Sequence, residues 1–354
     1  MKQKHFLVAL SLTMAGLFSC SKDPLTEETT TTNNAISATS TEQVLTRTSN
    51  FFYGVSGQPL SIPYPYNLLT PKKQIEIIKS MGMNIYRFNA EFQVKKGITT
   101  VPYRFSPLKE AADAAKITLL PYFSIRTLDY NKKEADNYND ARSFGVKIGL
   151  KNKDNFTYYE VGNELDNLCI IRNKNYSGEK VTHYDYPKLI AINAAIKGMI
   201  DGIKYSDPSA KIVVNCSWMH YGFMDFLLKN KAKIDIIGWH WYSDMESAAK
   251  SNYGINDITQ FLANRYSNKP IWFTEFNVKD SGSSIDEKTQ QTFIKNFLVK
   301  CQNNSRVQAA LVWELLDQPE RSSTENNYGL ITYVTNVTNN LVPKIFAEAT
   351  STLL

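Results

Sequence analysis

The chain has 354 residues, of which 43% are hydrophobic, 21% charged and 12% aromatic. It carries 40 Lys and Arg residues against 34 Asp and Glu residues, a net charge of +6. These values exclude disordered, collagen-like and disulfide-scaffold proteins, and the absence of a run of Lys or Arg argues against a nucleic-acid partner.

The first 20 residues have the layout of a secretory signal, because Lys2 and Lys4 precede a short apolar core over residues 6–15. The ending Leu17-Phe18-Ser19-Cys20 resembles a bacterial lipobox, in which the Cys thiol takes a diacylglycerol. The alternative is a small cysteine in a buried helix. We expect a lipoprotein signal peptide over 1–19 and lipid attachment at Cys20. The lipid would anchor the protein in the outer membrane, facing the periplasm or the cell surface.

Residues 20–48 are rich in Thr, Ser, Asn and Glu and have no apolar period, so they are predicted to form a flexible stalk. Residues 49–354 are then predicted to form a single folded domain. Three further cysteines, Cys169, Cys216 and Cys301, cannot make a complete disulfide framework, and their spacing matches no metal-ligand pattern. Buried free thiols are expected.

Eight short runs rich in β-branched and aromatic residues recur along this domain, as in buried parallel strands. They cover residues 51–55, 85–88, 117–123, 157–161, 212–216, 234–240, 271–274 and 310–314. Helical patterns lie between most of them, the clearest over 71–79, 108–115, 187–203 and 289–301. Thr70 is the expected N-cap of the first helix, which stops near Gly82.

Strand followed by helix, eight times, predicts an α/β fold, the (β/α)8 TIM barrel. The rival is a doubly wound open sheet, but no G-x-G-x-x-G follows any strand.

Functional residues of such a barrel lie at the C-terminal ends of its strands. Glu164 and Glu275 end the fourth and seventh predicted strands. A retaining glycosidase needs two carboxyl groups about 5–5.5 Å apart, one to protonate the leaving oxygen and one to attack the anomeric carbon. Apolar rings are expected to raise the pKa of the first, and Arg or Tyr donors to lower the pKa of the second.

Two motifs, Gly162-Asn163-Glu164 and Phe273-Thr274-Glu275-Phe276, resemble those of glycoside hydrolase clan A on strands four and seven. The resemblance extends over residues 51–354 and implies that Glu164 is the acid/base and Glu275 the nucleophile. It further implies sugar-binding or positioning roles for a set of neighbours: Asn163 toward the 2-hydroxyl, Arg87 and Tyr242 toward Glu275, Trp313 as the floor of the sugar pocket, and His240 beside them.

The family within the clan stays open, since His240 precedes Tyr242 by two residues in families 5 and 39 alike. Tyr328-Gly329-Leu330 and Pro343-Lys344 resemble a closing segment found in several of these families, including family 39.

Each of these side chains also has a simpler structural interpretation. Glu164 could cap a loop, Arg87 could neutralise a buried carboxylate, and His240 could be a satisfied core imidazole. Trp313 and Trp218 could be plain core, with Trp218 balanced between core and sugar platform. A zinc site is disfavoured, because the four histidines form no ligand pattern.

Competing residues complete the set of candidates. Glu160 lies inside the fourth strand, and Glu314 could line the cleft. Four aromatic residues are expected at the rim, where Tyr64-Pro65-Tyr66 is either a stacking surface or a stiff loop: Tyr64, Tyr66, Tyr130 and Trp241.

These features predict a lipid-anchored retaining β-glycosidase that hydrolyses an external β-linked polysaccharide or oligosaccharide, without cofactor or metal. The alternative is a catalytically silent barrel that binds glycans at the cell surface, which the anchor and rim aromatics suit equally. A complete Glu pair with Arg, Tyr and Trp neighbours disfavours it, since binding alone does not require them. A barrel esterase would need a G-x-S-x-G elbow or a metal cluster, and the sequence has neither motif.

Overall fold

The computed structural model describes residues 51–60, 64–90, 93–95, 98–100, 102–279, 285–322, 324–333 and 341–343. The expected signal peptide, Cys20 and the stalk lie outside these residues, as does Lys344.

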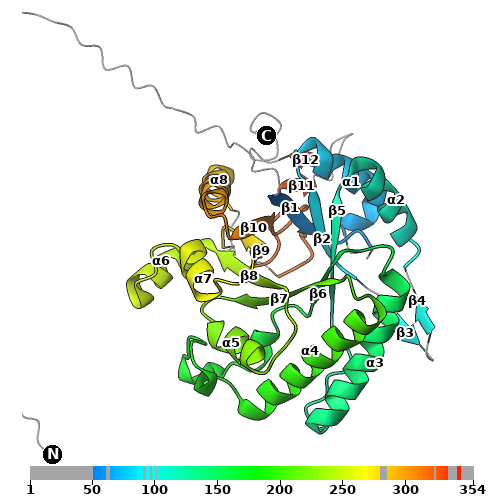
Figure 1. Cartoon of the computed structure of the whole chain (residues 1–354). Helices are drawn as coiled ribbons and strands as arrows, with labels where there is room; N and C mark the ends of the chain where they lie inside the picture. Colours follow the sequence, from blue (N-terminus) through cyan, green and yellow to red (C-terminus); the bar gives the residue numbers. More distant parts are fainter. Residues whose placement is uncertain are drawn as a thin grey trace, which may run out of the picture. The chain divides into compact units, whose positions relative to one another are not determined.

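Eight parallel strands form a closed barrel in the order β1-β10-β9-β8-β7-β6-β5-β2. The helices surround this ring of strands (Figure 1). All eight predicted strands are present and the (β/α)8 prediction is confirmed. The barrel strands are β1 (Phe52–Gly57), β2 (Ile85–Asn89), β5 (Thr118–Phe123), β6 (Tyr158–Val161), β7 (Lys211–Ser217), β8 (Ile236–Tyr242), β9 (Ile271–Asn277) and β10 (Val307–Val312).

Eight α-helices connect or flank these strands in the described part of the chain, and none of them is long and apolar enough to cross a membrane. The helices are α1 (Pro71–Ser80), α2 (Phe105–Ala115), α3 (Glu134–Asn152), α4 (Tyr186–Ser206), α5 (Tyr221–Lys229), α6 (Ser243–Tyr253), α7 (Ile258–Arg265) and α8 (Glu287–Asn303). Two antiparallel pairs lie outside the barrel: β3 (Gln93–Lys95) with β4 (Ile98–Thr100), and β11 (Ile331–Tyr333) with β12 (Leu341–Pro343).

Local sequence explains where α1 begins. The Thr70 side chain accepts a hydrogen bond from the Lys73 N–H at 3.1 Å, and Pro71 opens the helix. The chain turns after Ser80, and Gly82 follows with a φ of 69°. The predicted N-cap and stop are confirmed.

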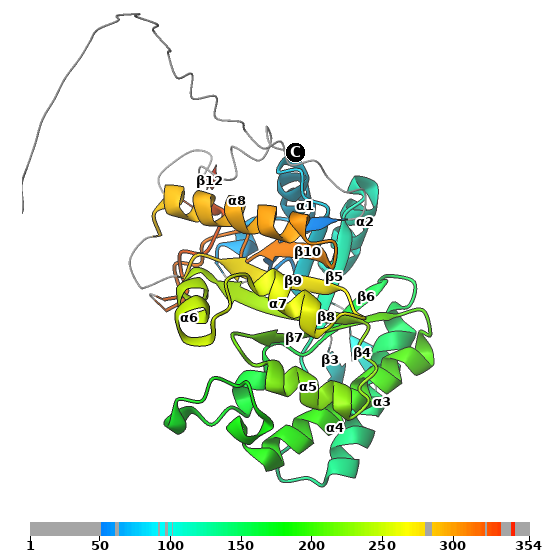
Figure 2. The same cartoon turned by 60° about the vertical axis from the view of Figure 1, so that its left-hand side comes forward.

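Helices α3 and α4 lie side by side in both views (Figures 1 and 2). Glycines allow this close approach: a Cβ at Gly145 would lie 2.3 Å from the Met199 carbonyl oxygen, and one at Gly198 would lie 2.1 Å from that of Tyr138. The apolar pattern of the sequence does not predict α3, because its buried face includes small residues such as Ala141, Gly145 and Gly149.

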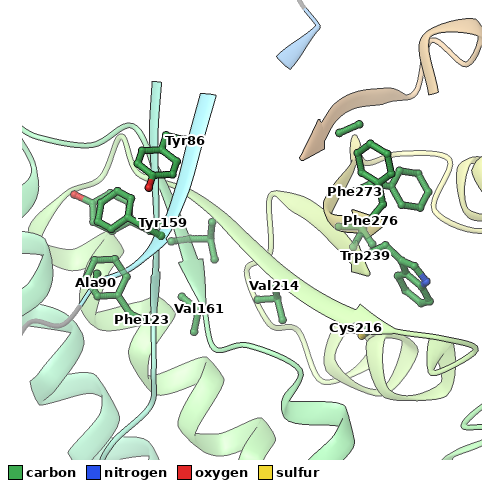
Figure 3. Close-up of a cluster of buried hydrophobic side chains, with 14 of the residues drawn as sticks. Tyr86, Ala90, Phe123, Tyr159, Val161, Val214, Cys216, Trp239, Phe273 and Phe276 are labelled. Carbon is green, nitrogen blue, oxygen red and sulfur yellow. The ribbon is translucent and has the colours of Figure 1, made fainter. Parts of the chain in front are cut away.

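Apolar side chains pack on both faces of the barrel strands, inside the barrel and between the strands and the helices. Alternate strand residues form an inner cluster: Ile85, Leu120, Val213, Ile236, Trp272, Ala309 and Leu311. Their neighbours along the strands point outward into a larger cluster (Figure 3), with Tyr86, Phe123 and Tyr159 in one group and Trp239, Phe273 and Phe276 in another. Cys169, Cys216 and Cys301 are buried and free, as expected.

Candidate active site

A polar layer lies beyond the inner apolar cluster, toward the C-terminal ends of the strands. Along three strands the residue two positions after an inner apolar one is polar: Arg87 follows Ile85, Tyr122 follows Leu120, and Asn215 follows Val213. Glu160 likewise follows Tyr158, which packs against the inner cluster. Because side chains alternate between the two faces of a strand, these groups converge inside the barrel.

Arg87 is the centre of this layer. It is fully buried and its three nitrogens donate to three different groups: Nε to Glu160 at 2.5 Å, Nη1 to Glu275 at 2.6 Å and Nη2 to Asn163 at 2.5 Å. Its guanidinium also lies 4.6 Å from the centre of the Tyr122 ring. The two carboxylates keep the pKa of Arg87 above its usual value, although burial acts in the opposite direction.

Glu275 reaches this layer because of an irregularity in β9. Against both neighbouring strands, β9 has one extra residue between Phe273 and Phe276. Phe273 and Phe276 both belong to the outer core, while Thr274 and Glu275 contact the interior. One Glu275 oxygen binds Arg87, and the other accepts the Tyr242 hydroxyl at 3.1 Å. The Glu275 side chain is 8% exposed, and its carboxylate is held at both oxygens.

Glu164 follows β6 in the left-handed region, with a φ of 47°. Its backbone N–H donates to Asn215 Oδ1 at 2.7 Å, and the Asn215 amide donates to Glu160 at 2.6 Å. Asn215 thereby ties the Glu164 backbone to the Arg87 network. The Glu164 carboxyl receives Asn167 Nδ2 at 3.1 Å, and its side chain remains 31% exposed.

His240 lies between the two glutamates. Its Nδ1 is 2.9 Å from Glu164 Oε1 and 3.4 Å from Glu275 Oε2, and its Nε2 is 3.1 Å from Thr274 Oγ1. Burial lowers the pKa of His240, but Glu275 and Glu164 outweigh it and the net pKa is raised. Burial raises the pKa of Glu164, but hydrogen bonds from His240 and Asn167 outweigh it and the net pKa is lowered. The expectation of a raised pKa at Glu164 is therefore wrong for the free protein, because a buried imidazole stands where apolar rings were expected.

One oxygen each of Glu164 and Glu275 and one nitrogen of His240 all lie within 4.8 Å of one another. This set could hold a divalent cation. The Arg87 guanidinium, 2.6 Å from Glu275, already neutralises one of the two carboxylates and would repel a cation placed beside it. The arrangement suits a substrate between two carboxyls better than a metal.

The pair opens into a cleft of about 700 Å³. Six of the predicted site residues line it: Asn163, Glu164, Trp218, Tyr242, Glu275 and Trp313. Arg87 and His240 lie behind this surface, fully buried. The structure therefore places all eight predicted site residues at the cleft or directly behind its surface.

Two tryptophans flank the cleft. Trp313 follows β10, with the Arg321 guanidinium 5.7 Å from its ring centre. Trp218 follows β7 and stacks on Trp241, with ring centres 6.0 Å apart at an interplanar angle of 19°. Both residues are partly exposed, and Trp218 also packs against the hydrophobic core.

Two rim predictions, those for Trp241 and Tyr66, are wrong. Trp241 is buried behind Trp218 because it lies within β8 and points outward. Tyr66 is fully buried and donates its hydroxyl to Glu314 at 3.1 Å. Glu314 is itself fully buried rather than on the cleft surface. Tyr64 and Tyr130 are not among the residues that line the cleft.

Sequence reasoning also missed residues that matter. Asn215 is a polar residue inside an apolar strand run, and that signal could have identified it. Asp166 and His220, which form a buried cluster beside the cleft, gave no such signal, because they lie outside the barrel strands and 54 residues apart in the sequence.

Residues 186–340 match the family model of the glycosyl hydrolase catalytic core. The match covers less than half of the chain; it includes Glu275 and Trp313 but not Glu164. No curated protein matches the chain.

Among solved structures, the chain resembles a family 1 β-glucosidase from Thermotoga maritima, with 11% identity, a TM-score of 0.62, and 86% of this chain and 97% of that chain covered. It also resembles the AHE enzyme from Alicyclobacillus herbarius, with 10% identity, a TM-score of 0.62 and coverage of 88% and 98%. The β-glycosidase BGL167 gives 14% identity, a TM-score of 0.63 and coverage of 86% and 95%. At such identities the similarity shows the TIM-barrel fold.

Proposed function

We propose that this protein is a retaining β-glycosidase of clan A type that acts on a β-linked glycan. The observation that carries the proposal is the Glu164–Glu275 pair, with one oxygen of each within 4.8 Å, at the base of an open cleft. A retaining enzyme needs carboxyls about 5–5.5 Å apart, whereas an inverting enzyme needs roughly 6.5–9.5 Å to admit a water. The catalytic-core match and the β-glucosidase neighbours support the same class.

The contacts of Glu275 suit a nucleophile. Arg87 and Tyr242 hold both of its oxygens by donating to them, so the carboxylate is fixed in position and supplied with positive charge. In the first step an oxygen of Glu275 bonds to the anomeric carbon while the bond from that carbon to the leaving oxygen breaks.

Glu164 would supply the proton that the leaving oxygen takes up. In the free protein its Oε1 lies 2.9 Å from Nδ1 of His240, so the two groups titrate as a coupled pair. A bound glycan displaces water from the partly exposed carboxyl and raises its pKa, which is the direction an acid requires. In the second step Glu164 takes a proton from water, the water oxygen bonds to the anomeric carbon, and Glu275 leaves.

The test is hydrolysis of a panel of 4-nitrophenyl β-glycosides and β-linked oligosaccharides by purified wild type, Glu164→Gln and Glu275→Gln. Each variant should lose kcat by about three orders of magnitude or more. Glu110→Gln, on the exposed side of α2, is the matched control and should retain full activity. Proton NMR of the first product should show the β-anomer; an α-anomer would mean inversion and reject the mechanism.

A silent glycan-binding barrel is the second candidate, favoured only by the two partly exposed tryptophans that line the cleft. Glycan binding by wild type without any hydrolysis over days would establish it.

We also propose that the barrel is tethered to the outer membrane by a lipid on Cys20, with its cleft toward the periplasm or the outside. The support is the lipobox-like sequence alone. Cys20→Ser should move the protein from the membrane fraction to the soluble fraction, and mass spectrometry of the N-terminal peptide should find the lipid in wild type only.

A further inference from the structure

A buried polar cluster lies at the end of β7, beside the Arg87 network. Asp166 is fully buried, and its Oδ2 accepts both the backbone N–H and the hydroxyl of Ser217 at 3.1 Å. The same oxygen lies 2.5 Å from Nδ1 of His220. When the neutral ring donates Nδ1–H to Asp166, its other nitrogen, Nε2, is a hydrogen-bond acceptor.

The imidazole of His220 is held in place by Asp166, and His220 belongs to the wall of the cleft. It lines the cleft but is only 5% exposed, and its Nε2 has no hydrogen-bond partner among the described residues. Gly178, in the long loop between β6 and α4, packs so tightly on the ring that a Cβ there would lie 2.1 Å from Cδ2. The Gly178 carbonyl accepts the Tyr184 hydroxyl at 2.7 Å and the Gly222 N–H at 3.0 Å, which anchors the loop against the ring.

The cluster lies on the acid/base side of the cleft. Asn167 Nδ2 is shared between Glu164 Oε2 at 3.1 Å and Ser217 Oγ at 3.2 Å, so a continuous chain of hydrogen bonds joins Glu164 to Asp166. The acid/base stands next to the leaving oxygen, and therefore side chains beyond it face the leaving group. Trp218 directly follows Ser217 and lines the same cleft.

We propose that His220 is a specificity residue for the leaving group: its Nε2 accepts a hydrogen bond from a hydroxyl of a second sugar that stacks on Trp218. The substrate class is then a β-linked disaccharide or longer oligosaccharide, rather than a glycoside with an apolar aglycone. This inference rests on the glycosidase function proposed above. It follows from a ring nitrogen of a cleft-lining residue that is held in a rigid setting and has no hydrogen-bond partner in the part of the chain that the structure describes.

The test compares two substrates of the same sugar in wild type and two variants. One substrate is the 4-nitrophenyl β-glycoside that wild type hydrolyses fastest, whose ring can stack but has no hydroxyl. The other is the best β-1,3- or β-1,4-linked disaccharide of that sugar. His220→Asn keeps an amide near the Nδ1 position, and so the bond to Asp166, but removes the Nε2 atom; His220→Gln places an amide near Nε2.

For His220→Asn, kcat/KM on the disaccharide should fall about 10-fold or more, the loss expected for one hydrogen bond to a polar group left unpaired. On the aryl glycoside it should change by less than about 3-fold. His220→Gln should retain more disaccharide activity than His220→Asn. Equal losses on both substrates, or no loss on either, would overturn the inference while leaving the glycosidase in place. No hydrolysis of any substrate by wild type would instead reject the proposed function, and this inference with it.

A second pair of variants tests the clamp on the ring. Gly178→Ala should displace the imidazole and lower disaccharide activity selectively, because the new Cβ meets Cδ2. Gly254→Ala is the matched control, since Gly254 also has a positive φ, 67° against 88°, but has open space around its Cβ position. If the two variants behave alike, backbone strain explains the effect and the clamp is rejected.

Discussion

Replacing Arg87 with Met removes a buried positive charge that joins β2 to Glu160, Asn163 and Glu275. The side chain is fully buried, and its guanidinium donates to Glu160, Glu275 and Asn163 at 2.5 to 2.6 Å. Met fills much of the same volume but leaves two carboxylates without their cation. We expect Arg87→Met to lose both stability and activity, for separable reasons.

The magnitude follows from what each carboxylate retains. Glu160 is fully buried and keeps only the Asn215 amide, so its charge is left uncompensated. Glu275 keeps the Tyr242 hydroxyl and lies 3.4 Å from the His240 ring, so its loss is smaller. Removing one partner of a buried ion pair costs about 3–5 kcal/mol. At about 2 °C per kcal/mol, the melting temperature should fall by about 6–10 °C.

The assay is urea unfolding followed by tryptophan fluorescence, for wild type, Arg87→Met, Glu160→Gln and the double variant. The double variant should recover about half of the lost stability, because the uncompensated Glu160 charge is gone. Its kcat/KM should stay at least about 100-fold below wild type, since Glu275 still lacks Arg87. A loss below about 1 kcal/mol in Arg87→Met, or no recovery in the double variant, would refute this reasoning.

Three further predictions concern pH and packing. His240→Phe removes a hydrogen-bond donor that lowers the pKa of Glu164. The alkaline limb of the pH profile of kcat/KM, where the acid loses its proton, should therefore move to higher pH, and a limb that stays in place would contradict this. Burial raises the pKa of Glu314 to about 8 from 4.5, so the folded state retains a proton that the unfolded state releases between these values. Stability should therefore fall as pH rises from about 5 to 8, by up to about 1.4 kcal/mol per unit, and Glu314→Gln should flatten this slope in urea titrations at several pH values. Gly145→Ala should cost about 3 kcal/mol by urea unfolding, because its Cβ would lie 2.3 Å from the Met199 carbonyl oxygen; an unchanged midpoint would mean that α3 and α4 can separate freely.

The barrel and its two glutamates could be read from the sequence for a simple reason. Buried parallel strands need runs of β-branched and aromatic residues, and eight such runs recur with helices between most of them. Closing the barrel brings the ends of all strands onto one rim, so Glu164 and Glu275 had to approach each other wherever the exact register fell. All eight strands could be predicted because the same strand pattern is repeated eight times.

Only the tertiary structure decided which way the rim side chains point and what surrounds them. Strand alternation by itself assigns Thr274 and Glu275 to opposite faces, but one extra residue in β9 turns both toward the interior. Trp241 and Tyr66 were expected at the rim and are buried. Trp241 packs in the outer apolar cluster, and the Tyr66 hydroxyl donates to the buried Glu314; no local sequence pattern encodes either contact.

The electrostatics were equally non-local. The pKa of Glu164 is lowered rather than raised because His240, which comes from a different strand, reaches its carboxyl. Asp166 and His220 are 54 residues apart in the sequence, and only the fold brings their side chains into contact. The sequence determines which groups are available and on which rim they gather. The fold determines their separations and partners, and those set their charge and chemistry.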